Sequence, residues 1–151
     1  MCSSDLLAKS WAWNAIIHRC QTHPDEVKFA RDIKTGDNIL HWCTFGNSSV
    51  DVINAVLNVH YDAIKETNYI TNNLPIHVAC SYRASNDVMK VLVDSYPESV
   101  GISNINGSYP IHILCEYDGP LSVFYTILSN PYVVPTVCMI DNVHYQYPIE
   151  I

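Results

Sequence analysis

The sequence predicts an all-α fold in which similar helix pairs stack as a solenoid, within a single domain spanning residues 1–151. The main observation is a recurring motif. Residues 74–80 read Leu-Pro-Ile-His-Val-Ala-Cys, residues 109–115 read Tyr-Pro-Ile-His-Ile-Leu-Cys, and residues 38–44 read Asn-Ile-Leu-His-Trp-Cys-Thr. The three histidines lie 36 and 35 residues apart. A period of this length is typical of stacked supersecondary units rather than of one globular core.

The period divides the chain into units. Residues 1–32 are predicted to form a partial first repeat. Residues 142–151 are the start of a truncated repeat and end in Tyr-Pro-Ile-Glu-Ile, residues 147–151. The full repeats are predicted at residues 33–68, 69–103 and 104–141. The partial repeat carries apolar residues at helical spacing over residues 5–21, so we expect one helix there, ended by the segment around Pro24.

Each full unit begins with a turn and a short helix. Five residues before the histidines stand Gly36, Asn72 and Gly107, residue types that tolerate a positive φ. Pro75 and Pro110 then suit the first turn of a helix, where a missing N–H costs nothing. The short helix should end near residues 45–46, 82–83 and 117–119.

A second helix completes each unit. It is expected to start at Ser49, at Ser85 or Asn86, and at Gly119-Pro120, by side-chain capping or by proline at the first helical position. Positions 12, 15 and 16 residues beyond each histidine are apolar in all three units, as a helix with one buried face requires. These positions are Ile53, Val56, Leu57, Met89, Leu92, Val93, Phe124, Ile127 and Leu128.

The turn, the Pro-Ile-His motif and the second helix around residues 88–93 together resemble ankyrin repeats over about residues 33–130. The chain departs from that family where Asn38, Leu74 and Tyr109 replace the usual threonine, and where Ile39 replaces the first proline. Each repeat is also slightly longer than the usual ~33 residues. The resemblance implies a helix-turn-helix solenoid with short β-hairpin or turn fingers, which serves as a protein–protein interaction scaffold without catalysis.

In ankyrin repeats, partners meet the finger tips and the inner face at the end of the first helix. Carried over by register, the resemblance implies contact positions that share this placement: Lys34, Thr35, Asp37, Ile70, Thr71, Asn73, Ile105, Asn106, Ser108, Phe45, Tyr82, Glu116 and Tyr117. An aromatic residue recurs at the end of each first helix, and aromatic residues are enriched at binding hot spots. The alternative is that these rings pack over the following loop. Glu116 and Asp118 beside Tyr117 favour a basic or arginine-bearing ligand.

The histidines and cysteines raise two chemical alternatives. His77 with Cys80, and His112 with Cys115, could form zinc half-sites or a nucleophile–base pair of a hydrolase. Both pairs recur at the structural period, and no oxyanion-hole or phosphate-loop motif accompanies them. We therefore expect each histidine to bond backbone between units and each cysteine to pack as a small apolar residue. No catalytic residue, metal or cofactor is assigned.

Composition sets limits on partners and location. The chain is 48% hydrophobic and 15% charged, with a net charge of −7, and its last 61 residues carry −6 without any Lys or Arg. Nucleic acid and anionic membranes are therefore poor partners. The N-terminus lacks a basic region followed by an apolar stretch, and the six cysteines are widely spaced. These features indicate an intracellular protein, cytoplasmic or nuclear, with reduced thiols.

The C-terminal region predicts an exposed apolar edge. Several apolar side chains precede the truncated repeat: Val133, Val134, Val137, Cys138, Met139 and Ile140. Solenoid ends normally need a polar capping repeat. The expectation is therefore that the chain is a regulatory fragment of a larger multidomain protein, or that this edge is covered by a partner or by self-association.

Overall fold

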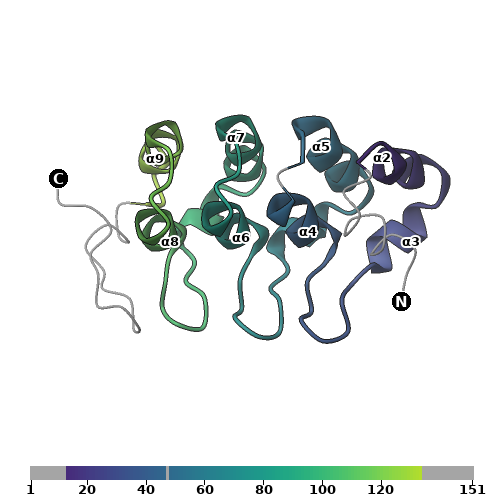
Figure 1. Ribbon diagram of the computed structural model, residues 1–151, viewed down its shortest axis with the longest axis horizontal. Coiled ribbons are helices and arrows are strands. Elements are labelled where there is room, and N and C mark those ends of the chain that lie inside the picture. The colour runs from purple at the N-terminus through teal and green to yellow at the C-terminus, as the bar shows by residue number, and fades with distance from the viewer. Residues whose placement is uncertain (1–12, 47, 134–151) are drawn as a thin grey trace.

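The computed structural model describes residues 13–46 and 48–133, and this part of the chain folds into eight α-helices and two 3₁₀ helices (Figure 1). The elements are α2 (Trp13–Thr22), α3 (Pro24–Phe29), α4 (Ile39–Phe45), α5 (Val50–Val59), η1 (Tyr61–Lys65), α6 (Pro75–Ser81), α7 (Asn86–Ser95), η2 (Pro97–Gly101), α8 (Pro110–Glu116) and α9 (Leu121–Leu128). Within the described residues there is no strand, only an isolated antiparallel bridge between Arg31 and Asn38. The all-α prediction is confirmed.

The helices form two layers (Figure 1). In one layer α2 packs on α5, α5 on α7 and α7 on α9, and in the other α4 packs on α6 and α6 on α8. Each α-helix from α4 to α7 thus contacts the helix that occupies the same position in the next repeat. Loops project from the layer of short helices, at the bottom of Figure 1. None of the described helices combines the length and apolarity that crossing a bilayer requires.

The predicted turns and short helices are confirmed. Gly36, Asn72 and Gly107 have φ values of 76°, 51° and 79°, in the left-handed region. Each short helix has seven residues, and Pro75 and Pro110 are the first residues of α6 and α8. These prolines cost no hydrogen bond because the first N–H groups of a helix have no partner inside it.

The second helices start within one residue of the predicted positions. Ser85 caps α7 by accepting a hydrogen bond from the N–H of Val88 at 3.3 Å. Pro120 precedes the first helical residue of α9 instead of occupying it, so the expectation of a proline at that first position is wrong by one residue. The extended backbone of Pro120, with ψ of 143°, lies outside the helical region.

Of the helix predicted over residues 5–21, the structure describes α2, and residues 1–12 lie outside the described part. The segment at Pro24 does end α2, but it forms a short helix of its own, α3. The related segments in the next two units form η1 and η2. The truncated repeat and the apolar edge beyond Val133 fall on residues 134–151, which also lie outside the described part.

The core lies between the two layers. Seven of the nine apolar positions predicted for the second helices are buried, whereas Phe124 and Leu128 are half-buried. Both of these belong to α9, the last helix that the structure describes. Burying a large aliphatic side chain stabilises the fold by about 1.5 to 3 kcal/mol, so this stripe is a major source of stability.

Two of the motif histidines bond backbone through both ring nitrogens. In His41 and His77, Nδ1 accepts a hydrogen bond from the N–H of Asn38 at 3.1 Å and of Leu74 at 2.9 Å, respectively. With Nδ1 as acceptor, Nε2–H is the donor in the neutral ring. It bonds the carbonyl of Asn73 at 2.8 Å for His41 and that of Ile102 at 2.9 Å for His77. For His41 the predicted backbone bonding between units is confirmed, whereas the bond from His77 reaches the end of its own repeat, residues 69–103.

The buried histidines predict acid sensitivity. Burial lowers the pKa of His77 to about 4 from its ordinary 6.5, and burial also lowers the pKa of His41. The unfolded chain therefore binds protons that the folded chain excludes, so stability should fall as pH decreases from about 6.5 toward 4. Urea titrations at pH 7.5, 6 and 5 should show a falling midpoint. In His77→Gln the fall should be smaller, and an equal fall in both proteins would contradict the assignment.

Candidate partner-binding groove

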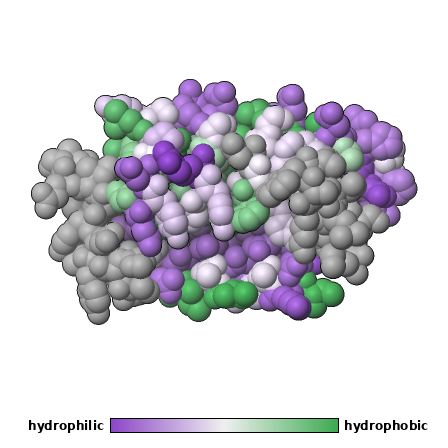
Figure 2. All heavy atoms as spheres, viewed as in Figure 1, coloured by the Kyte–Doolittle hydropathy of each residue, from purple (hydrophilic) through white to green (hydrophobic). Residues whose placement is uncertain are grey.

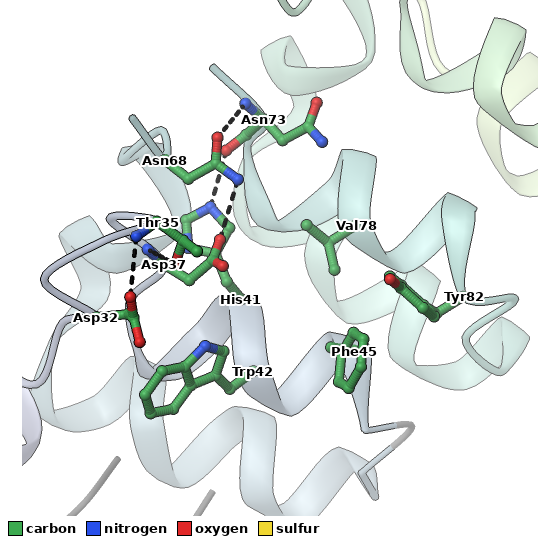
Figure 3. A pocket seen from close by; sticks show the side chains of 10 residues that line it. All are labelled: Asp32, Thr35, Asp37, His41, Trp42, Phe45, Asn68, Asn73, Val78 and Tyr82. Carbon is green, nitrogen blue, oxygen red and sulfur yellow. Dashed lines mark hydrogen bonds between the residues drawn. The ribbon is translucent and has the colours of Figure 1, made fainter. Parts of the chain in front are cut away.

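A groove of about 430 Å³ lies between the first two full repeats, residues 33–68 and 69–103, on the face of the short helices (Figure 3). Loop residues on either side and the helices α4 and α6 build it. It is lined by Asp32, Thr35, Asp37, His41, Trp42, Phe45, Asn68, Asn73, Val78 and Tyr82. Its volume lies within the range of about 300 to 1,000 Å³ that is common for ligand sites.

Three finger loops, residues 32–37, 68–73 and 104–108, each fold around one side chain. The Oδ1 atom of Asp32 accepts hydrogen bonds from two backbone N–H groups of its loop, both at 2.9 Å. The Oδ1 atoms of Asn68 and Asn104 likewise each accept two, at 3.0 to 3.2 Å. The sequence analysis missed these three positions, although their spacing of 36 residues was a signal that could have found them.

Hydrogen bonds join neighbouring finger loops. The N–H of Tyr69 donates to the carbonyl of Thr35 at 2.8 Å, and the N–H of Ile105 donates to the carbonyl of Thr71 at 2.9 Å. A side-chain hydrogen bond also joins the first two loops, since Nδ2 of Asn68 donates to Oδ1 of Asp37 at 3.0 Å. The loops are therefore held in register with one another and form a fixed wall of the groove.

Aromatic rings form the opposite end of the groove (Figure 3). The rings of Phe45 and Tyr82 meet edge to face, with centroids 4.3 Å apart and planes at 65°. They remain 45% and 52% exposed, and Tyr117 is 49% exposed, so none of the three is a core residue. Trp42 is 8% exposed and lines the groove between the aromatic pair and the first finger loop. A partner could thus cover substantial ring area here.

The charged residues that line the groove are both acidic. Asp32 and Asp37 lie on the first finger loop, and no Lys or Arg is among the lining residues. The nearby Arg31 forms an ion pair with Glu66. Although burial alone would raise it, hydrogen bonds from Asn38 and Arg31 hold the pKa of Glu66 below its ordinary value. Arg31 is therefore neutralised by a partner of its own, and the groove keeps its negative charge.

The predicted contact residues divide between the groove and its surroundings. The groove collects five of them: Thr35, Asp37, Phe45, Asn73 and Tyr82. It does not include Lys34, Ile70, Thr71, Ile105, Asn106, Glu116 and Tyr117. Besides Asp32 and Asn68, the sequence analysis missed His41, Trp42 and Val78 as lining residues. The resemblance implied contacts only at the finger tips and at the ends of the first helices, and these three positions lie inside α4 and α6.

One predicted contact residue is wrong. Ser108 is only 4% exposed, so it offers no surface to a partner. Its N–H donates to Oδ1 of Asn104 at 3.0 Å, and its carbonyl accepts from the N–H of Asn104 at 2.9 Å. Ser108 ends the third finger loop, which has one residue fewer than the other two loops.

Apolar side chains also gather along the edge where the finger loops project, at the bottom of Figure 2. The exposed isoleucines of these loops are Ile33, Ile70 and Ile105. They lie outside the groove lining, and Ile70 and Ile105 belong to the predicted tip positions. This edge could extend a contact surface beyond the groove.

His77 and Cys80 have the environment of core residues. Cys80 is fully buried, and burial raises the pKa of its thiol; burial also raises the pKa of Cys115, to about 11. Thiols with raised pKa values are poor nucleophiles and poor metal ligands. Both ring nitrogens of His77 are already bonded to backbone. Within residues 13–46 and 48–133, no group of three potential metal-ligating residues occurs.

Comparison with known proteins finds no protein-family model and no curated protein that matches this sequence.

Proposed function

We propose that this chain is an ankyrin-like helix-turn-helix solenoid that binds another protein or peptide and has no catalytic activity. The helix pairs that contact each other at a fixed period support this proposal. So do the positive φ values at Gly36, Asn72 and Gly107 and the bond that His41 makes to the next unit. Free thiols at Cys20, Cys43, Cys80 and Cys115 support a reducing, intracellular setting, in the cytoplasm or the nucleus.

The observation that carries the proposal is the groove between the first two units. Solvated helix ends are usually polar, yet Phe45 and Tyr82 present half-exposed rings to this hollow. Aromatic anchors in a concave site contribute strongly to binding because they bury a large area at low entropic cost. The groove has room for a few side chains, which suits an extended segment of a partner protein.

The test is selection of peptides from a random display library on the full chain, followed by affinity measurement. The double variant Phe45→Ala/Tyr82→Ala should bind the selected peptides at least about tenfold more weakly, as expected for hot-spot residues. The matched control is Tyr125→Ala, because Tyr125 is 65% exposed on α9, outside the groove.

Circular dichroism and thermal melting must show that both variants remain folded. Selected peptides that bind the double variant as tightly as the original chain would refute binding at this groove. A double variant that fails to fold would instead be replaced by Phe45→Leu/Tyr82→Leu, which keeps apolar volume and removes the rings.

A further inference from the structure

The first finger loop carries negative charge that its structural role does not require. Asp37 accepts a hydrogen bond from Nδ2 of Asn68 at 3.0 Å. One unit further, the neutral Asn73 accepts the same bond from Nδ2 of Asn104, also at 3.0 Å. An amide oxygen therefore serves equally well at this position.

Asp32 is comparable, since the neutral Asn68 and Asn104 also hold their loops by accepting two backbone N–H bonds, although from other positions of the loop. Two carboxylates on one short loop repel each other, and an amide at either position would remove this cost. The hydrogen bond that Asp37 makes does not require its charge, so a ligand gives that charge a use.

The rest of the groove matches a planar cation. Only one oxygen of Asp37 receives a hydrogen bond within the described residues, so the second is open to a ligand. Val78 and Ile113 stand at the position of Trp42 in the next two repeats. Like the two carboxylates of the first finger loop, the indole ring therefore has no counterpart there. The carboxylates and the rings of Trp42, Phe45 and Tyr82 line one cavity.

We propose that this groove binds an arginine side chain of the partner protein. The guanidinium pairs with Asp37 and stacks against the aromatic rings that line the groove. This inference rests on the proposed function and names the partner's chemistry. Guanidinium is planar, offers several donors to carboxylate and stacks on aromatic faces, whereas the ammonium group of lysine is a compact and strongly hydrated charge. The net charge of −7 further attracts a basic segment.

The test titrates the ¹⁵N-labelled full chain with three probes: Nα-acetyl-arginine amide, the lysine equivalent, and the citrulline equivalent, which is nearly isosteric with arginine but neutral. The arginine probe should shift the amide and side-chain signals of Asp37, Trp42 and Tyr82 and bind most tightly, with citrulline about tenfold weaker. Asp37→Asn should weaken the arginine probe about tenfold, because it keeps the hydrogen bond from Asn68 and removes the charge.

The matched control is Asp62→Asn, which removes the same charge from an exposed position on η1. It should leave the titration unchanged. Should Asp37→Asn fail to fold, Asp32→Asn removes the other carboxylate that lines the groove and should also weaken the arginine probe, since Asn68 and Asn104 show that an amide is tolerated at the equivalent loop position.

Equal binding of arginine and citrulline, or no shift at the groove with any probe, would overturn the arginine assignment. The peptide selection separates this failure from a failure of the proposed function. Groove-binding peptides without arginine would leave the interaction function standing and refute only the arginine. Selected peptides that bind elsewhere would refute the groove as the binding site, and a chain that selects no peptide at all would refute the proposed function itself.

Discussion

Replacing His77 with alanine is expected to lower the free energy of unfolding by about 2 to 6 kcal/mol, because two buried backbone groups would each lose a partner at about 1 to 3 kcal/mol. These groups are the N–H of Leu74 and the carbonyl of Ile102, both now bonded to the imidazole. The ring is fully buried, so the substitution also leaves a cavity between two units. Urea unfolding followed by circular dichroism measures the change.

His18→Ala is the matched control, because His18 is exposed on α2 and should contribute little. The difference between the two variants isolates the effect of the buried ring from that of losing a histidine. A His77→Ala protein as stable as the original chain, together with a Cys80 thiol that reacts rapidly with alkylating agents in the original folded chain and slowly in the variant, would mean that the ring serves chemistry rather than the fold.

Gly36→Ala is expected to destabilise the first finger loop through two separate effects. The φ of 76° costs an L-residue about 1 to 2 kcal/mol. A methyl group would also lie 2.5 Å from Cγ of Tyr69, so the ring must move, at about 1 to 3 kcal/mol for overpacking. The melting temperature should fall accordingly.

The double variant Gly36→Ala/Tyr69→Ala separates the two effects. Removing the ring relieves the clash but not the backbone strain, so Gly36→Ala should cost less in the Tyr69→Ala background than in the original chain. Equal costs in both backgrounds would show that the loop moves away from Tyr69 without penalty. The stacking of the second finger loop on the first would then be weaker than the structure indicates.

Much of the local structure could be read from the sequence. The turn at Gly36, Asn72 and Gly107 needs a positive φ, and the residue types that allow it stand in the sequence itself. The helix starts at Pro75 and Pro110 follow from the fixed φ of proline and its missing N–H. These features depend on a few adjacent residues, so their spacing was sufficient to place them. The apolar stripes, read at helical period, likewise indicated which face of each second helix is buried.

The groove was decided by tertiary structure. Its walls come from residues as far apart as Asp32 and Tyr82, which meet only once two units have packed together. The register placed Ser108 at a finger tip, whereas packing left it only 4% exposed, and Trp42 lines the hollow although it is only 8% exposed. Whether a side chain faces a partner depends on which neighbours cover it. Those neighbours lie about one repeat away in the chain. The local sequence pattern around a residue does not show which of them will pack on it.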